Sequence, residues 1–205
     1  MPYLDLSHAF TGSMPTYPGD PTPELKQITT LEKEGYVDHL IHTTMHVGTH
    51  IDAPMHMIAS GKKISDIPAE KFFGRGVLID ARGKKIIDED TLQNISLHAG
   101  DIVLLCTGWN EHYRTPTYFE NFPTLTEALA KKFIEAQVSM VGVDTPSPDL
   151  APFPIHKLLL AKEILIIENL TNLTSLLSTP SFDIIALPIK FAADGAPARI
   201  IAKII

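Results

Sequence analysis

The sequence lacks the features that mark disulfide-stabilised, membrane-spanning or nucleic-acid-binding proteins. Its 205 residues include a single cysteine, so no disulfide can form within the chain. No stretch approaches the roughly 18 consecutive apolar residues that a membrane-spanning helix needs. Acidic side chains outnumber basic ones, and the formal net charge of −7 argues against a nucleic acid or an anionic membrane surface as partner.

The N-terminal segment also lacks the pattern of a secretory signal. No basic region precedes an apolar stretch there, and Asp5 interrupts the hydrophobic residues. We therefore expect a cytoplasmic protein. The one cysteine, Cys106, ends an apolar run that begins at Ile102, and we expect it to behave as a small buried hydrophobic residue.

The chain does contain enough apolar material for one core, since 44% of its residues are hydrophobic. It shows no repeat, linker or low-complexity stretch, so we expect one domain over residues 1–205. Short β-rich runs outnumber helical segments, which favours a mixed α/β domain over regular alternation of strands and helices. The expected strands are residues 3–7, 76–81, 102–107, 138–144, 164–167, 184–189 and 198–205.

Two helices are expected. The run Thr124-Leu125-Thr126-Glu127 fits a capping box and predicts a helix that continues to Gln137. A second helix is predicted from Pro154 to Lys162, with proline in its first turn. Further along the chain, Asp194-Gly195-Ala196-Pro197 has the composition of a turn.

Histidines are concentrated between His39 and His56, where five of the nine lie. From position 42 to position 56, the even positions carry four histidines and Asp52, while the odd positions are largely apolar. A strand sends alternate side chains to opposite faces, so this parity predicts a strand with one polar face. A helix is disfavoured by Gly48, by β-branched neighbours and by Pro54.

A straight strand would not bring these histidines together. At about 3.3 Å per residue, His46 and His50 would lie about 13 Å apart, whereas a metal–imidazole bond is about 2.1 Å long. Gly48 lies midway between them, so we predict a bend or bulge at this residue. His50 and Asp52, two residues apart, need no such bend.

A second group of polar residues follows downstream. It comprises Asp144-Thr145-Pro146-Ser147, then His156 at the start of the second expected helix, and Glu168 directly after the apolar run 164–167. A carboxylate at the end of a buried strand is costly unless it is paired or bound to a metal.

At these residues the sequence resembles the cyclase-type metal-dependent hydrolases, a family that includes bacterial kynurenine formamidase (arylformamidase). The run from His46 to His56 matches the family motif H-x-G-T-H-x-D-x-P-x-H at every specified position. The resemblance extends to Tyr17-Pro18-Gly19-Asp20-Pro21, to the run from Asp144 to Ser147, and to His156 and Glu168-Asn169-Leu170. It implies a mixed β barrel-like core with surrounding helices, in a homodimer or a higher homo-oligomer.

The resemblance also implies two divalent metal ions. His46, His50 and Asp52 would hold one ion, and Asp52 would bridge to a second ion held by His156 and Glu168. Two such ions can share a water, lower its pKa and polarise a carbonyl group. Mixed nitrogen and oxygen ligands favour zinc, with manganese as the alternative.

The resemblance assigns the acid–base role to His56, and histidine suits proton transfer. Where the formamidase branch carries a tryptophan before Pro-Gly-Asp, this chain has Tyr17, which we expect to contact the substrate. The opening Leu4-Asp5-Leu6-Ser7 also differs from the Trp-Asp-Ile-Ser of that branch. Both differences concern the substrate rather than the metal chemistry.

We therefore expect an arylformamidase-type hydrolase with a small-molecule substrate, which would convert an N-formylkynurenine-like compound to kynurenine and formate through a metal-bound hydroxide. One alternative is ring opening of a cyclic imide or lactam, as in the isatin-hydrolase branch. A second alternative is a non-catalytic metal-binding module. His56 argues against that module, because a purely structural metal site needs no spare base.

Overall fold

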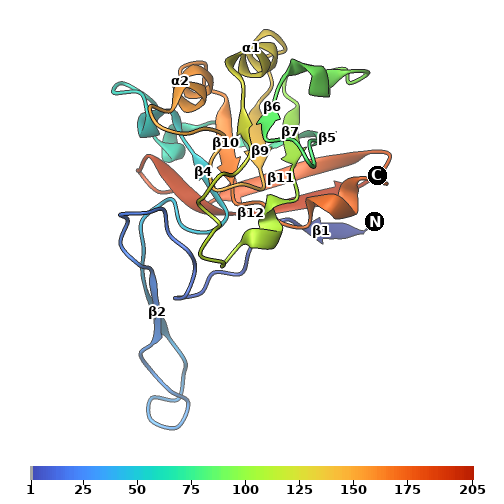
Figure 1. The fold of residues 1–205 in the computed structure, drawn as a ribbon. Coiled ribbons are helices and arrows are strands. Elements are labelled where there is room, and N and C mark those ends of the chain that lie inside the picture. The colour runs from blue at the N-terminus through green and yellow to red at the C-terminus, as the bar shows by residue number, and fades with distance from the viewer. Residues whose placement is uncertain (1) are drawn as a thin grey trace.

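The computed structural model describes residues 2–205, and a closed β-sheet forms its centre (Figure 1). Its strands are β1 (Tyr3–Asp5), β4 (His50–Asp52), β5 (Phe73–Asp80), β7 (Ile102–Cys106), β9 (Met140–Val143), β10 (Leu165–Glu168), β11 (Phe182–Pro188) and β12 (Gly195–Ile204). Seven of them follow the order β12-β11-β5-β7-β9-β10-β4, and pairing of β4 with β12 closes the ring. β1 pairs with β12 from outside this ring. The mixed α/β class and the barrel-like core are thereby confirmed.

The central strands β5, β7, β9 and β10 run parallel, and β7, β9 and β10 are buried along their whole length, which explains the near-continuous apolar sequences of these three. Alternate residues of β7 enter two different cores. Ile102, Leu104 and Cys106 pack inside the barrel, whereas Val103 and Leu105 pack toward the helices. Burial raises the pKa of the Cys106 thiol to about 12, so this residue behaves as the inert hydrophobic residue that was expected.

Both expected helices are present, α1 (Glu127–Glu135) and α2 (Pro154–Leu160), and they pack against the second of these cores. The N-cap of α1 is Thr126, whose hydroxyl accepts from the Leu129 amide at 3.2 Å. The capping box placed at Thr124 was therefore wrong by two residues. Thr124–Leu125 instead forms strand β8, which pairs with β6 (Ile86–Ile87).

The histidine-rich segment is not the continuous strand that its parity predicted. Residues 45–49 form a turn, β4 is three residues long, and a 3₁₀ turn follows at Pro54–His56. The predicted bend is confirmed, because Gly48 adopts a left-handed conformation with φ of +69°. The turn expected at 194–197 was wrong, since Gly195 begins β12 and pairs with Asp52 of β4.

The first part of this segment belongs to a separate hairpin. Strands β2 (Glu24–Gln27) and β3 (His39–His42) form a two-stranded sheet that extends away from the barrel (Figure 1). Short 3₁₀ helices complete the structure at Ile64–Asp66, Ala69–Phe72, Glu89–Leu92, Trp109–His112 and Leu173–Leu176. None of the helices within residues 2–205 is long and apolar enough to cross a membrane.

Candidate metal centre

The five predicted metal ligands converge on one cluster from four parts of the chain. His46 lies in the turn before β4, His50 and Asp52 lie on β4, His156 lies on α2, and Glu168 ends β10. β4 runs antiparallel to β10, and their register places His50 directly opposite Glu168. Directly opposed residues point to the same face of a sheet, so strand pairing brings these two side chains together.

The ring of His50 is oriented by a backbone carbonyl group. Its Nδ1 donates to the Gly48 oxygen at 2.8 Å, which directs Nε2 toward the cluster. The same carbonyl accepts from Nδ2 of Asn169 at 3.0 Å. Nε2 of His50 faces two carboxylates and lies 3.3 Å from Asp52 Oδ1 and 3.3 Å from Glu168 Oε2.

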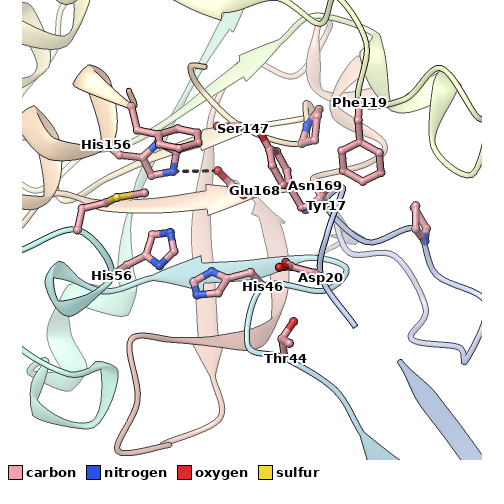
Figure 2. Close-up of a pocket in the computed structure, with 14 residues that line it drawn as sticks. Tyr17, Asp20, Thr44, His46, His56, Phe119, Ser147, His156, Glu168 and Asn169 are labelled. Atoms are coloured by element: carbon pink, nitrogen blue, oxygen red, sulfur yellow. Dashed lines mark hydrogen bonds and ion pairs between the residues drawn. The ribbon is translucent and has the colours of Figure 1, made fainter. Parts of the chain in front are cut away.

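His156 is oriented by a buried carboxylate. Its Nδ1 donates to Asp149 Oδ1 at 2.6 Å, and the other oxygen of Asp149 accepts from the Ile155 amide at 2.6 Å. Nε2 therefore faces the cluster and lies 3.1 Å from Glu168 Oε1 (Figure 2). It also lies 3.5 Å from Asp52 Oδ2. A carboxylate on the outer nitrogen is the usual way in which proteins orient a metal-binding histidine.

His46 and His56 share the carboxylate of Asp194. Oδ2 of Asp194 lies 2.8 Å from His46 Nε2 and 3.2 Å from His56 Nδ1. The other nitrogen of His46 lies 2.7 Å from Asp52 Oδ1. Gly195 permits this approach, because a Cβ at that position would lie 3.0 Å from His46 Cε1 and 2.8 Å from a backbone oxygen.

The donor atoms of this cluster fit a divalent cation. Among residues 2–205, Nε2 of His50 and Oδ2 of Asp52 are both buried and find no hydrogen-bond partner. An unsatisfied buried polar atom costs on the order of 1–3 kcal/mol, and a cation between these two atoms would satisfy both. Imidazole nitrogens and carboxylate oxygens are common ligands of divalent transition metals.

The candidate ligand atoms form two overlapping groups. Those of His50, Asp52 and Glu168 lie within 4.8 Å of one another, and so do those of His46, Asp52 and His56. Asp52 belongs to both groups, as a bridging ligand would. The second group pairs His46 with His56 rather than with His50, so the division of ligands between two ions and the acid–base role of His56 stay predictions.

Protonated histidines balance the negative charge of the carboxylates in this cluster. Burial lowers the pKa of His46 and His50, but the neighbouring carboxylates outweigh it and raise the two values to about 9 and about 10. Burial also opposes ionisation of Asp52, yet the surrounding histidines hold the pKa of its carboxyl well below its usual range. A cation that enters this cluster must displace the histidine protons.

A cavity of about 440 Å³ lies beside the cluster (Figure 2). Its lining combines cluster residues with aromatic rings: His46, His56, His156, Glu168, Tyr17, Phe119 and Phe153. Tyr17 packs edge-to-face against Phe119, with 5.8 Å between ring centroids. Tyr17 thus lies in the lining of the cavity, and its contact with substrate stays a prediction.

The sequence pattern did not predict which residues orient the histidines. Asp149 lies shortly before α2, and Asn169 belongs to the matched run Glu168-Asn169-Leu170, but neither had been given this role. Asp194 was read only as part of a turn. The loop 110–123 contributes Phe119 to the cavity, whereas the indole of Trp109 donates to the carbonyl of Tyr118 at 2.8 Å within that loop.

Comparison with known proteins agrees with this architecture. The Cyclase family, described as "Putative cyclase", matches residues 4–150. A kynurenine formamidase of Geobacillus thermodenitrificans (strain NG80-2) is 32% identical, over 97% of this chain and 95% of its own. The solved structure of isatin hydrolase A from Ralstonia solanacearum superposes with a TM-score of 0.89 at 25% identity, covering 100% of this chain and 92% of that one.

A solved structure described as a "predicted metal-dependent hydrolase from Bacillus stearothermophilus" has a TM-score of 0.80 and 28% identity. It covers 98% of this chain and 97% of its own. The family match includes the whole run from His46 to His56, and the formamidase relative matches almost the full length of both chains. The chain therefore belongs to the Cyclase family.

Proposed function

We propose that this protein is a metal-dependent hydrolase that cleaves the C–N bond of small aryl formamides such as N-formylkynurenine. The observation that carries the proposal is a cluster of histidine and carboxylate side chains beside a cavity with aromatic walls. The similarity to a kynurenine formamidase over nearly the whole chain supports this substrate class.

The residues of the cavity suit this reaction. A bound divalent metal would polarise the formyl carbonyl and lower the pKa of the attacking water. His56, whose Nδ1 contacts Asp194 at 3.2 Å, has its Nε2 left to take a proton from the water and pass it to the leaving amine. Tyr17 and Phe119 would pack against the aromatic part of the substrate.

We further propose two ions, held by His46, His50, Asp52, His156 and Glu168, with zinc favoured over manganese. The sharing of Asp52 between the two ligand groups supports this count. The homo-oligomeric state and the cytoplasmic location stay predictions.

Ring opening of a cyclic imide or lactam is the second candidate, because the solved isatin hydrolase shares the fold across the full length of this chain. The same cluster would serve either substrate, so the cavity lining must discriminate between them. A non-catalytic metal-binding module is the third, and it leaves the exposure of His56 to the cavity unexplained.

The test is to load the purified protein with zinc or manganese, measure the metal content, and assay formanilides and isatin in parallel. We expect turnover of the formanilides, and Tyr17→Ala should raise KM more than it lowers kcat, because it removes mainly ground-state binding. Tyr3→Ala is the control, since Tyr3 is 63% exposed and lies on β1. Opening of isatin without deformylation would select the second candidate, and full metal content without any turnover would select the third.

A further inference from the structure

Tyr118 lies in the loop between β7 and β8 and is fully buried, although its side chain carries a hydroxyl group. The hydroxyl donates to Oδ1 of Asn169 at 2.7 Å. Burial raises the pKa of Tyr118 well above its ordinary value, so the hydroxyl remains a donor across the neutral pH range. This hydrogen bond ties the loop to the residue that directly follows the predicted ligand Glu168.

The hydroxyl of Tyr118 determines which way the amide group of Asn169 faces. An amide side chain has an accepting oxygen and a donating nitrogen. Because Oδ1 accepts from Tyr118, Nδ2 faces the carbonyl group of Gly48, to which it donates at 3.0 Å. The reverse orientation would direct the amide oxygen at the carbonyl oxygen and would remove this donor from Gly48.

The carbonyl group of Gly48 is the point at which these hydrogen bonds reach the predicted metal ligands. It also accepts from Nδ1 of His50 at 2.8 Å, and one carbonyl oxygen can accept from two donors. Gly48 has no side chain of its own to hold the turn, so donors from elsewhere must fix its carbonyl group. A displaced carbonyl oxygen would let the His50 ring turn away from Asp52 and Glu168, which its Nε2 now faces.

Tyr118 also supports one wall of the cavity. Phe119, the next residue, lines the cavity together with Asn169 (Figure 2). The rings of Tyr118 and Phe119 lie edge to face, with 5.1 Å between their centroids. The backbone of Tyr118 is held as well, because its carbonyl group accepts from the indole of Trp109 at 2.8 Å. Tyr118 therefore connects the aromatic wall of the cavity to the cluster.

We propose that Tyr118 is a positioning residue for His50, and that it couples cation binding at the cluster to the order of the loop that carries Phe119. It acts through the amide of Asn169 and the carbonyl group of Gly48. The inference rests on the metal centre of the proposed function but not on its substrate. Coupling between two sites is reciprocal, so a cation held by His50 should in turn stabilise the loop.

The first test measures the zinc affinity of the protein by competition with a chromophoric chelator, and the ligand geometry from the absorption spectrum of cobalt(II)-substituted protein. Tyr118→Phe should bind zinc about 10–100-fold more weakly, as is typical when a group that orients a metal-binding histidine is removed. Its cobalt spectrum should also change. Tyr113→Phe is the matched control, because the buried hydroxyl of the neighbouring Tyr113 finds no hydrogen-bond partner among residues 2–205.

A second variant tests the route through Asn169. Glycine tolerates the φ of +57° at this position, so Asn169→Gly removes the amide without straining the backbone. This variant should also bind zinc more weakly, and adding Tyr118→Phe to it should cause no further loss, because both substitutions break the same connection. Additive losses of affinity would mean that Tyr118 does not act through Asn169, and would overturn the proposal.

Hydrogen exchange tests the coupling in the opposite direction. Zinc should slow amide exchange in residues 115–120 of the wild-type protein, but not in Glu89–Leu92, which lies outside the cavity lining. The effect on residues 115–120 should be lost in Tyr118→Phe. Should that variant not fold, the wild-type measurement still decides, since exchange in residues 115–120 that zinc leaves unchanged would overturn the coupling.

The outcomes separate this proposal from the proposed function. Wild-type zinc affinity and an unchanged cobalt spectrum in folded Tyr118→Phe would overturn the role of Tyr118 and leave the metal centre intact. A wild-type protein that binds no zinc would overturn the metal centre together with this proposal. None of these measurements requires turnover of a substrate.

Discussion

At the scale of single residues, the chemistry of the cluster depends on how each histidine ring is oriented. His50, His156 and His56 each direct one ring nitrogen to an oxygen acceptor of the protein, which leaves the other nitrogen for a cation or a substrate. A ring held in this way has one tautomer and one direction available, and both matter for metal binding and for proton transfer.

We predict that His56→Ala lowers kcat by about 10²–10⁴-fold while the protein retains its metal, because a general acid–base group typically contributes that much. Steady-state kinetics and metal analysis of the same preparation measure both quantities. His98→Ala is the control, since the side chain of His98 is 66% exposed and lies beside Arg75. Loss of most of the metal in His56→Ala would instead make His56 a ligand, in line with its proximity to Asp52.

His8 predicts a pH dependence of stability that does not involve the metal. Its ring stacks on Tyr113 with 3.6 Å between centroids, and burial, reinforced by the charge of Arg114, lowers its pKa from 6.5 to about 4. Folding therefore favours the neutral ring, and this stabilisation is present above pH 6.5 and is lost as the pH falls through 4. After allowance for the partial exposure of His8, this stabilisation amounts to about 1–2 kcal/mol.

The variant His8→Phe should keep the stacking and remove this titration. Its free energy of unfolding should fall less than that of the wild-type protein between pH 7 and pH 4, as measured by denaturant titration at each pH. If the free energies of unfolding of the two proteins fall equally between pH 7 and pH 4, protonation of His8 does not contribute to the pH dependence of stability.

At the scale of elements, the bend before β4 decides whether the histidines can act together. Gly48 adopts a φ of +69°, which side chains branched at Cβ strongly disfavour, and its carbonyl oxygen orients His50. A Cβ at this position would also lie 2.8 Å from Met14 Cε.

We predict that Gly48→Val lowers metal occupancy and turnover together, because the change displaces the turn that carries His46 and orients His50. Gly83→Val is the matched control, since Gly83 has a φ of +78° and no atom within 4 Å of an added Cβ. Both variants should be less stable than the wild-type protein. Per mole of folded protein, however, only Gly48→Val should bind less metal. Wild-type occupancy in Gly48→Val would refute this account of the glycine.

At the scale of the whole molecule, the candidate metal centre joins segments that are distant in the sequence. The predicted ligands come from the turn before β4, from β4 itself, from α2 and from the end of β10. A cation that binds only the folded chain stabilises it by about 2.7 kcal/mol at one hundred times its dissociation constant. For a domain of this size, that corresponds to a rise in Tm of about 5–10 °C.

We therefore expect zinc or manganese to raise the Tm of chelator-treated protein, as measured by calorimetry. The rise in Tm should be smaller at pH 6 than at pH 8. The metal must displace the protons of His46 and His50, whose pKa values are about 9 and about 10, and this displacement costs more free energy at the lower pH. The Glu168→Gln variant should show little of this metal-induced rise in Tm. An unchanged Tm in the wild-type protein would mean that the folded state binds neither ion.

The sequence by itself determined the apolar central strands, both helices and the bend at Gly48, and it predicted the ligand residues of the candidate site. Each of these is a local property: a motif, an apolar run, a proline at a helix start or a glycine between two histidines. Tertiary structure decided the rest. Histidine parity predicted one long strand, but pairing with β10 and β12 confines β4 to His50–Asp52. Likewise, only strand pairing draws Asp194 toward His46 and His56, because a carboxylate in an apparent turn carries no sequence signal for partners more than one hundred residues away.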